Sequence, residues 1–159
     1  MKAVARIRRL EPDTPEAELA ARWRYEAFFA DSGDTFEESR RDLFASLGQQ
    51  GYEIGLLAEI DGTPAGLCLF VRNEIDAKHD LTPWLAALYV APDFRRQAIG
   101  RALVKAIEDH ARSVGTEILH LYTIEAEAFY AKLGWVTRER FDWHGDKMVL
   151  MVRTLTPGR

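Results

Sequence analysis

The amino-acid sequence predicts an α+β domain built on one mixed, mostly antiparallel sheet. Helical and strand-like hydrophobic periods alternate along the chain, and two pairs of strand-like segments are each joined by turn-forming residues. One long amphipathic segment lies between two further strand-like segments, and such a connection favours a parallel, right-handed crossover. We expect about six to seven strands flanked by about four helices.

The first part of the chain contributes an edge strand and a helix. Residues 1–9 alternate loosely and predict a short strand at the sheet edge. Asp13 or Thr14 can cap the helix that follows, and Pro15 suits its first turn. Apolar residues then recur at helical spacing through Phe29.

A second helix follows a break at residues 31–34. Thr35 and Glu38 have the spacing of a capping box, and Gly48 marks the end of the helix. Residues 52–60 and Thr63–Val71 then alternate like strands, and the Asp-Gly pair between them is a strong hairpin signal. The polar loop at 72–83 is long enough to suggest a function.

The central part of the chain is a strand, a turn and a helix. The apolar run Trp84–Val90 predicts a buried strand, and Pro92 lies in the turn that follows it. Residues 97–114 have an apolar helical stripe that includes His110, and Gly115 supplies the stop.

The last part of the chain predicts a strand, a short helix and a hairpin. The strand covers 117–123 and includes His120, and the helix lies within 126–134. Strands at 135–141 and 148–155 form the hairpin, and 156–159 is expected to be a loose tail. We therefore treat residues 1–159 as one domain.

Composition restricts the function classes. With 47% hydrophobic and 29% charged residues, the 159-residue chain is typical of a globular protein, and its net charge of −4 argues against a general attraction to nucleic acid. The single cysteine, Cys68, fits a reducing compartment and a place in the core. No apolar run approaches the ~20 residues of a membrane span, and no signal-peptide core follows the basic N-terminus. We expect a cytoplasmic protein with no membrane partner.

The turn between Val90 and the central helix has the features of a phosphate-binding device. Backbone N–H groups and the positive end of the helix dipole converge there, and arginines 95, 96 and 101 add positive charge. A solvated basic turn at the start of an ordinary helix would have a similar sequence. The P-loop Lys-Ser/Thr and the three glycines of a dinucleotide fingerprint are both absent from this turn.

Two motifs in this chain resemble those of the GNAT superfamily of N-acetyltransferases. LYVAPDFRRQAIGRALV resembles the acetyl-CoA signature Arg/Gln-x-x-Gly-x-Gly/Ala, with Arg95, Ala98 and Gly100 on the pattern. Ala98 stands where the family has its first glycine, and an alanine is sterically acceptable there if its dihedrals are the ordinary right-handed helical ones. AEAFYAKLGW, about thirty residues further on, resembles the family's Ala-x-x-Phe-Tyr-x-Lys-x-Gly-Phe motif.

The resemblance implies how acetyl-CoA is held. In the family, the fourth and fifth strands splay apart and the pantetheine arm lies between them, so Trp84–Val90 and 117–123 are the expected pair. A backbone N–H near Leu88 would polarise the thioester carbonyl. The implied cofactor-binding residues are Leu88, Tyr89, Val90, Arg95, Arg96, Gln97, Ala98, Ile99, Gly100, Arg101 and Thr123.

Tyr130 is the implied general acid that protonates the departing thiolate of CoA. Helical spacing alone would favour a tyrosine packed in the core, which is what we expect of Phe129 beside it. The general base is left open, because the strand Trp84–Val90 carries no carboxylate. A less basic acceptor amine is one solution, and water relaying a proton to Glu53, His79, Glu125 or His144 is another.

Acceptor recognition in this family comes from the loop between the first two helices and from the late hairpin. The residues implied here are Tyr25, Phe29, Asp31, Asp34, Trp143, His144 and Asp146. Aromatic rings with carboxylates suit a cationic amine. His110 and His120 are interpreted as packing residues, and no spacing of ligand residues predicts a metal site.

The sequence therefore predicts an acetyl-CoA-dependent N-acetyltransferase. Its acceptor would be the primary amine of a small molecule, amino acid or peptide, and transfer would be direct. A non-catalytic acyl-CoA-sensing or interaction domain of the same fold, or a transferase for a bulkier acyl group, are the alternatives. Homodimerisation is common among relatives, although no residue of this sequence specifies it.

Overall fold

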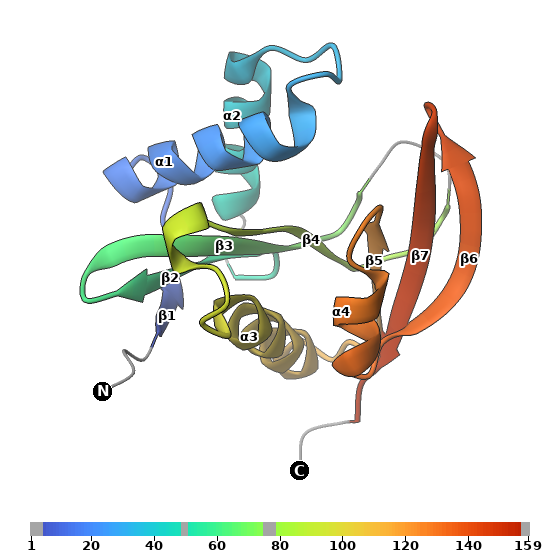
Figure 1. Cartoon of the computed structure of the whole chain (residues 1–159). Helices are drawn as coiled ribbons and strands as arrows, with labels where there is room; N and C mark the ends of the chain where they lie inside the picture. The colour runs from blue at the N-terminus through green and yellow to red at the C-terminus, as the bar shows by residue number, and fades with distance from the viewer. Residues whose placement is uncertain (1–4, 49–50, 75–78, 157–159) are drawn as a thin grey trace.

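A mixed sheet runs through the whole molecule. The computed structural model describes residues 5–48, 51–74 and 79–156, and within them the sheet has seven strands in the order β1-β2-β3-β4-β5-β7-β6 (Figure 1). Every neighbouring pair is antiparallel except β4 and β5, which are parallel. The strands are β1 (Arg6–Arg9), β2 (Ile54–Ile60), β3 (Thr63–Val71), β4 (Trp84–Val90), β5 (Ile118–Thr123), β6 (Val136–Trp143) and β7 (Asp146–Thr154).

Helices cover both faces of the sheet. The helix α1 (Pro15–Arg24), its π-helical continuation η1 (Tyr25–Phe29) and α2 (Phe36–Leu47) lie on one face, and α3 (Ile99–Ser113) and α4 (Glu127–Lys132) lie on the other (Figure 1). The predicted α+β class and its mixed, mostly antiparallel sheet are thus confirmed. The π-helical turn was not expected, because an apolar period cannot distinguish it from an ordinary helical turn.

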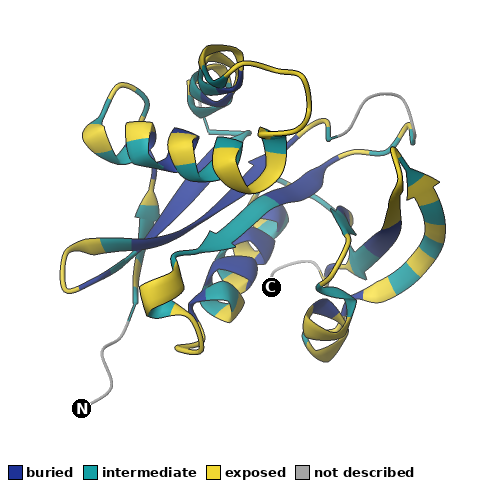
Figure 2. Cartoon of the chain, turned by 45° about the horizontal axis from the view of Figure 1, so that its top comes forward, coloured by how far each residue is buried: buried dark blue, intermediate teal, exposed yellow. Residues whose placement is uncertain are grey.

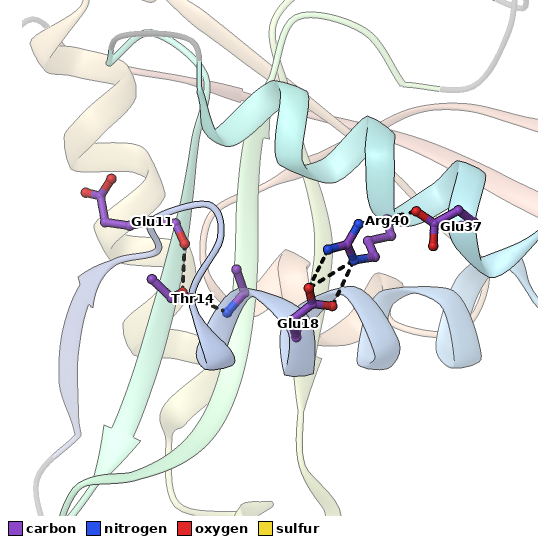
Figure 3. Close-up of polar contacts among 6 residues, drawn as sticks. Glu11, Thr14, Glu18, Glu37 and Arg40 are labelled. Atoms are coloured by element: carbon purple, nitrogen blue, oxygen red, sulfur yellow. Dashed lines mark hydrogen bonds and ion pairs between the residues drawn. The ribbon is translucent and has the colours of Figure 1, made fainter.

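The starts of α1 and α2 are set by side-chain caps. The hydroxyl of Thr14 accepts the N–H of Ala17 at 3.1 Å, and that of Thr35 accepts the N–H of Glu38 at 3.1 Å. Across the two helices, Arg40 contacts Glu18 through atoms 2.5–3.0 Å apart (Figure 3). This pair fixes α2 against α1.

Two separate cores lie on either side of the sheet. Leu103, Ile107 and Ala111 of α3 pack on one face, and Ala17 of α1 and Leu43 of α2 pack on the other. Figure 2 shows the buried residues along the central strands and on the inner sides of the helices. Cys68 is fully buried, as predicted, and burial raises the pKa of its thiol.

Tight turns join the antiparallel strands. Asp61 and Gly62 both have positive φ, 50° and 80°, which is the primed geometry expected of an Asp-Gly hairpin. His144 and Gly145 form the corresponding turn between β6 and β7, with φ of 50° and 88°. The turn is therefore shorter than the gap between the expected strands at 135–141 and 148–155, and both strands are longer than expected. The predicted tail is described only as far as residue 156.

Candidate functional site

A bulge in β4 shapes the centre of the sheet. Leu69 and Leu67 of β3 pair with Ala86 and Tyr89, so β4 carries one residue more than its partner over this stretch. Ala87 takes up the extra length with a φ of 54°. Beyond the bulge, Leu88 packs toward the core under α3, whereas the ring of Tyr89 contacts α1 at Trp23, 5.2 Å between centroids.

The strands β4 and β5 separate on one side of this bulge. Trp84 pairs with His120, and no other residue pair between the two strands is in register within the described chain. The backbone of β4 from the bulge onward therefore has no β5 strand beside it. This agrees with the splay that the family resemblance implied, and it leaves backbone groups near Leu88 available to an extended ligand.

A cavity of about 910 Å³ occupies the gap. Its lining takes Leu85 and Tyr130 from the core under α3, and Leu43 and Leu69 from the core under α1 and α2. Residues of both layers thus meet in one space.

The turn after β4 leads into the first helical turn of α3. Ala102 closes the first backbone bond of the helix on Ala98 at 3.1 Å, so the N–H groups just before it precede the helical ladder. Arg96 and Ala98 have φ of 66° and 62°. Ala98 therefore does not have the right-handed dihedrals that would make an alanine sterically acceptable there, because the position has the left-handed geometry that favours glycine.

Two contacts position the turn between β4 and α3. Arg95 donates from Nε to the carbonyl of Val90 at 3.0 Å, which ties the turn to the end of β4. Gly100 faces Phe129 of α4, whose Cζ would lie 3.4 Å from an added Cβ. Phe129 was expected in the core, but it is 36% exposed. The next residue of α4, Tyr130, is the one whose side chain is buried instead.

Tyr130 lines the cavity and is otherwise enclosed. The residue is 6% exposed, and its ring packs at 6.0 Å from that of Trp135. Burial, with a smaller contribution from Cys68, raises the pKa of the phenol. The hydroxyl makes no hydrogen bond with the residues that the structure describes, so its proton is available to a ligand in the cavity.

The cavity is acidic. Its described lining includes the carboxylates of Asp42, Glu53, Glu74, Glu125 and Asp146, against the single guanidinium of Arg24. Arg24 donates to the carbonyl and the hydroxyl of Ser39 at 3.1 and 2.9 Å. Burial raises the pKa of Glu74 to about 7, although Arg24 opposes the shift.

The structure brings some of the predicted site residues together at this cavity. Phe29, Leu88, Thr123, Tyr130 and Asp146 line it, as do the base candidates Glu53 and Glu125. Thr123 also lies just before α4, where its hydroxyl accepts the N–H of Ala126, the N-cap residue of the helix, at 3.0 Å. The residues from Arg95 to Arg101 lie at the turn into α3, outside the described lining.

Other predicted residues lie elsewhere. Tyr25, Asp31, Asp34, Trp143 and His144 are not part of the cavity lining that the structure describes. Tyr25 donates to the carbonyl of Asp34 at 3.2 Å, and Trp143 and His144 lie at the end of the β6–β7 hairpin. His110 and His120 pack as expected, the first with Nε2 at 2.8 Å from the carbonyl of Tyr52.

Sequence reasoning missed Arg24, Glu74 and Tyr122 among the lining residues. Arg24 and Glu74 come from segments far apart in the chain, and no local motif connects them. Tyr122 follows the strand alternation that places Leu121 on the other face, so its position on the sheet could have been found.

The described chain holds neither a candidate metal cluster nor a candidate membrane-spanning helix. No cluster of three or more histidine, cysteine or acidic side chains there has the geometry to hold a metal ion. None of the described helices is long and apolar enough to cross a membrane.

Three solved structures illustrate the similarity of the fold. An aminoglycoside 6'-N-acetyltransferase complexed with coenzyme A has 16% identity and a TM-score of 0.75, covering 97% of this chain and 99% of that one. A candidate acetyltransferase from Salmonella typhimurium, solved with its cofactor acetyl-CoA, has 18% identity and a TM-score of 0.74 over 97% and 95%. A GNAT acetyltransferase from Streptococcus pneumoniae has 19% identity and a TM-score of 0.71 over 96% and 100%.

At these identities the structural matches show the fold alone. A comparison with curated protein sequences finds no match. The model of the acetyltransferase (GNAT) family matches residues 17–135, which is most of the chain and includes α3 and α4. The splayed strands, the turn into α3 and this match agree with one another, and the chain belongs to the GNAT family of acetyltransferases.

Proposed function

We propose that this protein transfers the acetyl group of acetyl-CoA directly to the nitrogen of a cationic primary amine. The acidic cavity between β4 and β5 carries the proposal, because it joins the two faces of the sheet beside the Tyr130 phenol. The acceptor would be the amine of a small molecule, an amino acid or a peptide.

The donor side of the proposal rests on the turn into α3. Free backbone N–H groups at the start of a helix and arginine side chains favour a diphosphate. Leu88, Tyr89 and Val90 would hold the pantetheine arm, because no β5 strand lies beside that part of β4. The coenzyme A and acetyl-CoA in two of the similar structures support this choice of donor.

The proposed reaction is one nucleophilic displacement. The neutral amine attacks the thioester carbon and forms a C–N bond, while the backbone N–H of Leu88 stabilises the negative oxygen. The C–S bond then breaks, and the thiolate of CoA takes the phenolic proton of Tyr130. The ammonium formed on the new amide nitrogen loses one proton, which restores Tyr130 directly or through solvent.

The character of the lining supports a cationic acceptor with an apolar part. Carboxylates outnumber arginine in the described lining, so an ammonium is favoured over an anion. Phe28 and Ile124 also line the cavity, and they remain 49% and 48% exposed. An apolar group of the acceptor could cover both side chains.

Two measurements test the proposal. Thermal unfolding with CoA, acetyl-CoA and longer acyl-CoA thioesters reports donor binding, and acetyl-CoA should raise the midpoint of unfolding. Thiol release from acetyl-CoA should then depend on an added amine, in a panel of alkylamines, diamines, amino acids and aminoglycosides. Binding of acetyl-CoA without thiol release in the presence of any acceptor would instead support the acyl-CoA-sensing alternative. A larger rise in the unfolding midpoint with longer thioesters than with acetyl-CoA would support a bulkier donor.

A further inference from the structure

Three side chains from separate elements form a continuous hydrogen-bonded chain beside the cavity. The Nδ1 atom of His79, in the loop before β4, lies 2.5 Å from the hydroxyl of Tyr122 on β5. The Nε2 atom of the same ring lies 3.0 Å from Oε1 of Glu139 on β6. Tyr122 lines the cavity, so the chain starts there.

Aromatic packing holds this chain in place. The ring of Tyr122 stacks on Trp84 at 4.5 Å, and the ring of Phe141 contacts both Tyr122 and His79, at 5.6 and 5.3 Å. Both links of the chain are therefore fixed by neighbours that cannot themselves take up a proton. The side chain of His79 is 15% exposed and that of Glu139 is 42% exposed, so the chain runs from the cavity toward solvent.

Hydrogen-bond chemistry fixes the direction of each bond. An ionised carboxylate can only accept, so Nε2 of His79 must donate to Glu139. In the neutral ring Nδ1 then carries a lone pair, and the hydroxyl of Tyr122 donates to it. Both donors thus point away from the cavity, and a lone pair of the Tyr122 oxygen is left to accept a proton from a ligand.

The proposed reaction needs such an acceptor. A primary amine is mostly protonated near neutral pH and cannot attack a thioester until one proton leaves. We propose that Tyr122, His79 and Glu139 form a relay that removes this proton from the acceptor ammonium and passes it to solvent. This inference rests on the proposed function of the cavity.

The relay conserves protons at each step. The ammonium N–H breaks as the Tyr122 oxygen accepts its proton, while the former hydroxyl proton moves to Nδ1 of His79. The phenol stays neutral and the imidazole becomes an imidazolium, whose charge the Glu139 carboxylate balances. Loss of one proton from the imidazolium to water returns the neutral ring, and the free amine remains in the cavity.

The charged groups around the relay suit this task. Burial and the neighbouring Glu74 and Glu139 carboxylates raise the pKa of Tyr122 to about 12. The phenol is therefore held in its protonated form, and it gives one proton to His79 as it takes another from the ligand. His120 also lies near enough to His79 for the two rings to influence each other electrostatically. The relay therefore supplies the base that the strand β4 lacks.

Nitrogen-15 NMR of the ring of His79 tests the hydrogen-bonded chain without any acceptor. At near-neutral pH the ring should be protonated at Nε2 and unprotonated at Nδ1, and Tyr122→Phe should shift the Nδ1 resonance. The variant His79→Gln assigns the signals, and Tyr52→Phe, which alters a phenol outside the cavity, should leave them unchanged. Protonation of the ring at Nδ1, or an Nδ1 resonance that Tyr122→Phe leaves unchanged, would overturn the relay.

Kinetics with two amines of matched size test what the chain does. Ethylamine is protonated near neutral pH, whereas 2,2,2-trifluoroethylamine is largely neutral because fluorine withdraws electrons. With ethylamine, Tyr122→Phe and His79→Gln should each lower kcat/KM by about 10–100-fold, and with trifluoroethylamine by less than about 3-fold. The exposed control Glu117→Gln should change neither value, and acetyl-CoA should protect every variant from thermal unfolding equally.

The outcomes separate the relay from the proposed function. An equal loss of kcat/KM with both amines would contradict the relay while leaving acetyl transfer intact. The proposed function would be contradicted if the wild-type protein released no thiol with either amine and none with any amine of the wider panel. In that case the tautomer of His79 alone would decide whether the hydrogen-bonded chain exists.

Discussion

Trp84 on β4 lies opposite His120 on β5, and this pair is the point from which the two parallel strands separate. The backbone N–H of His120 donates to the carbonyl of Pro83 at 3.2 Å, and its ring Nδ1 lies 3.0 Å from the same oxygen. Because a carbonyl can only accept, Nδ1 carries a proton, and burial favours the neutral form of the ring by lowering its pKa. The start of the gap is therefore fixed by a group that can titrate.

The stability of this anchor should depend on pH. Burial lowers the pKa of His120 below its ordinary value of 6.5, so below about that pH the unfolded chain binds a proton that the folded chain does not. The free energy of unfolding should then fall as the pH drops from about 6.5 through the lowered folded value. Urea unfolding of the wild-type protein and of His120→Asn over this range measures the effect, and the variant should have the flatter profile. His144→Asn, in the exposed turn, should keep the wild-type slope, and equal slopes in all three proteins would contradict the prediction.

Glu74 should act in the opposite direction. Its pKa is raised from 4.5 to about 7, so its contribution is fully present below about pH 4.5 and is lost as the pH rises through 7. Replacement by glutamine removes the buried charge. We expect Glu74→Gln to stabilise the protein above neutral pH by about 1–2 kcal/mol, less than the whole shift because the side chain keeps some exposure.

Urea unfolding in mildly alkaline and mildly acidic buffer measures the Glu74 effect. The variant Glu125→Gln is the matched control, since this carboxylate lines the same cavity but is exposed. A stabilisation of Glu74→Gln that is the same in both buffers would show that its charge is not the cause.

Local signals were sufficient for most of the fold. The Thr35 cap, the Asp61 and Gly62 turn and the long stripe of α3 are each encoded within a few neighbouring residues, so a reader of the sequence can find them. The Ala98 geometry could not be found in this way. An alanine on the family pattern suggests a helical position, and only the path of the chain between η2 (Pro92–Phe94) and α3 requires a positive φ.

The candidate site was predicted less completely than the fold. Tyr130 and Leu88 belong to motifs, and both line the cavity. Glu74 and His79 lie in a polar loop whose residues have no periodicity, and their partners come from β5, β6 and α1. Such contacts depend on how distant segments meet, which a local pattern does not describe.

Gly66 should be intolerant of a side chain because β3, β4 and α3 meet around it. An added Cβ would lie 2.8 Å from the backbone oxygen of Tyr89 and 3.1 Å from Leu103 of α3. We expect Gly66→Ala to lower the free energy of unfolding by about 1–3 kcal/mol and to weaken protection by acetyl-CoA, because α3 must move. Denaturant unfolding with and without acetyl-CoA measures both effects. At Gly48, where the nearest atoms would lie 3.6 Å away, alanine should be tolerated, and equal effects at the two positions would contradict this packing.

Ala98 offers a stabilising substitution beside the proposed diphosphate site. Its φ of 62° is strained for an alanine and natural for a glycine. Ala98→Gly should therefore raise the free energy of unfolding by about 0.5–1 kcal/mol, after allowing for the greater flexibility of glycine when unfolded. Ala91, with a φ of −60°, is the matched control, and Ala91→Gly should be destabilising. A loss of stability in both variants would argue against the left-handed geometry at 98.

Tyr130 allows the proposed chemistry to be separated from binding. Because burial raises its pKa, the phenol stays protonated throughout the range in which the protein is assayed, and activity should not fall at alkaline pH through this group. Tyr130→Phe keeps the ring contact with Trp135 but removes the proton that the thiolate of CoA would take. The variant should therefore retain protection by acetyl-CoA while kcat falls by about 100-fold or more, as measured by thiol release with a saturating amine.

The control for that experiment is Tyr52→Phe, which removes a hydroxyl from a ring packed on Phe70 outside the cavity. It should leave kcat and the acetyl-CoA shift unchanged. Loss of acetyl-CoA protection in Tyr130→Phe would indicate a binding function for the phenol, and unchanged kcat would remove Tyr130 as the acid. The thiolate would then have to take its proton from water, and the acidic cavity would serve only to bind and deprotonate the acceptor.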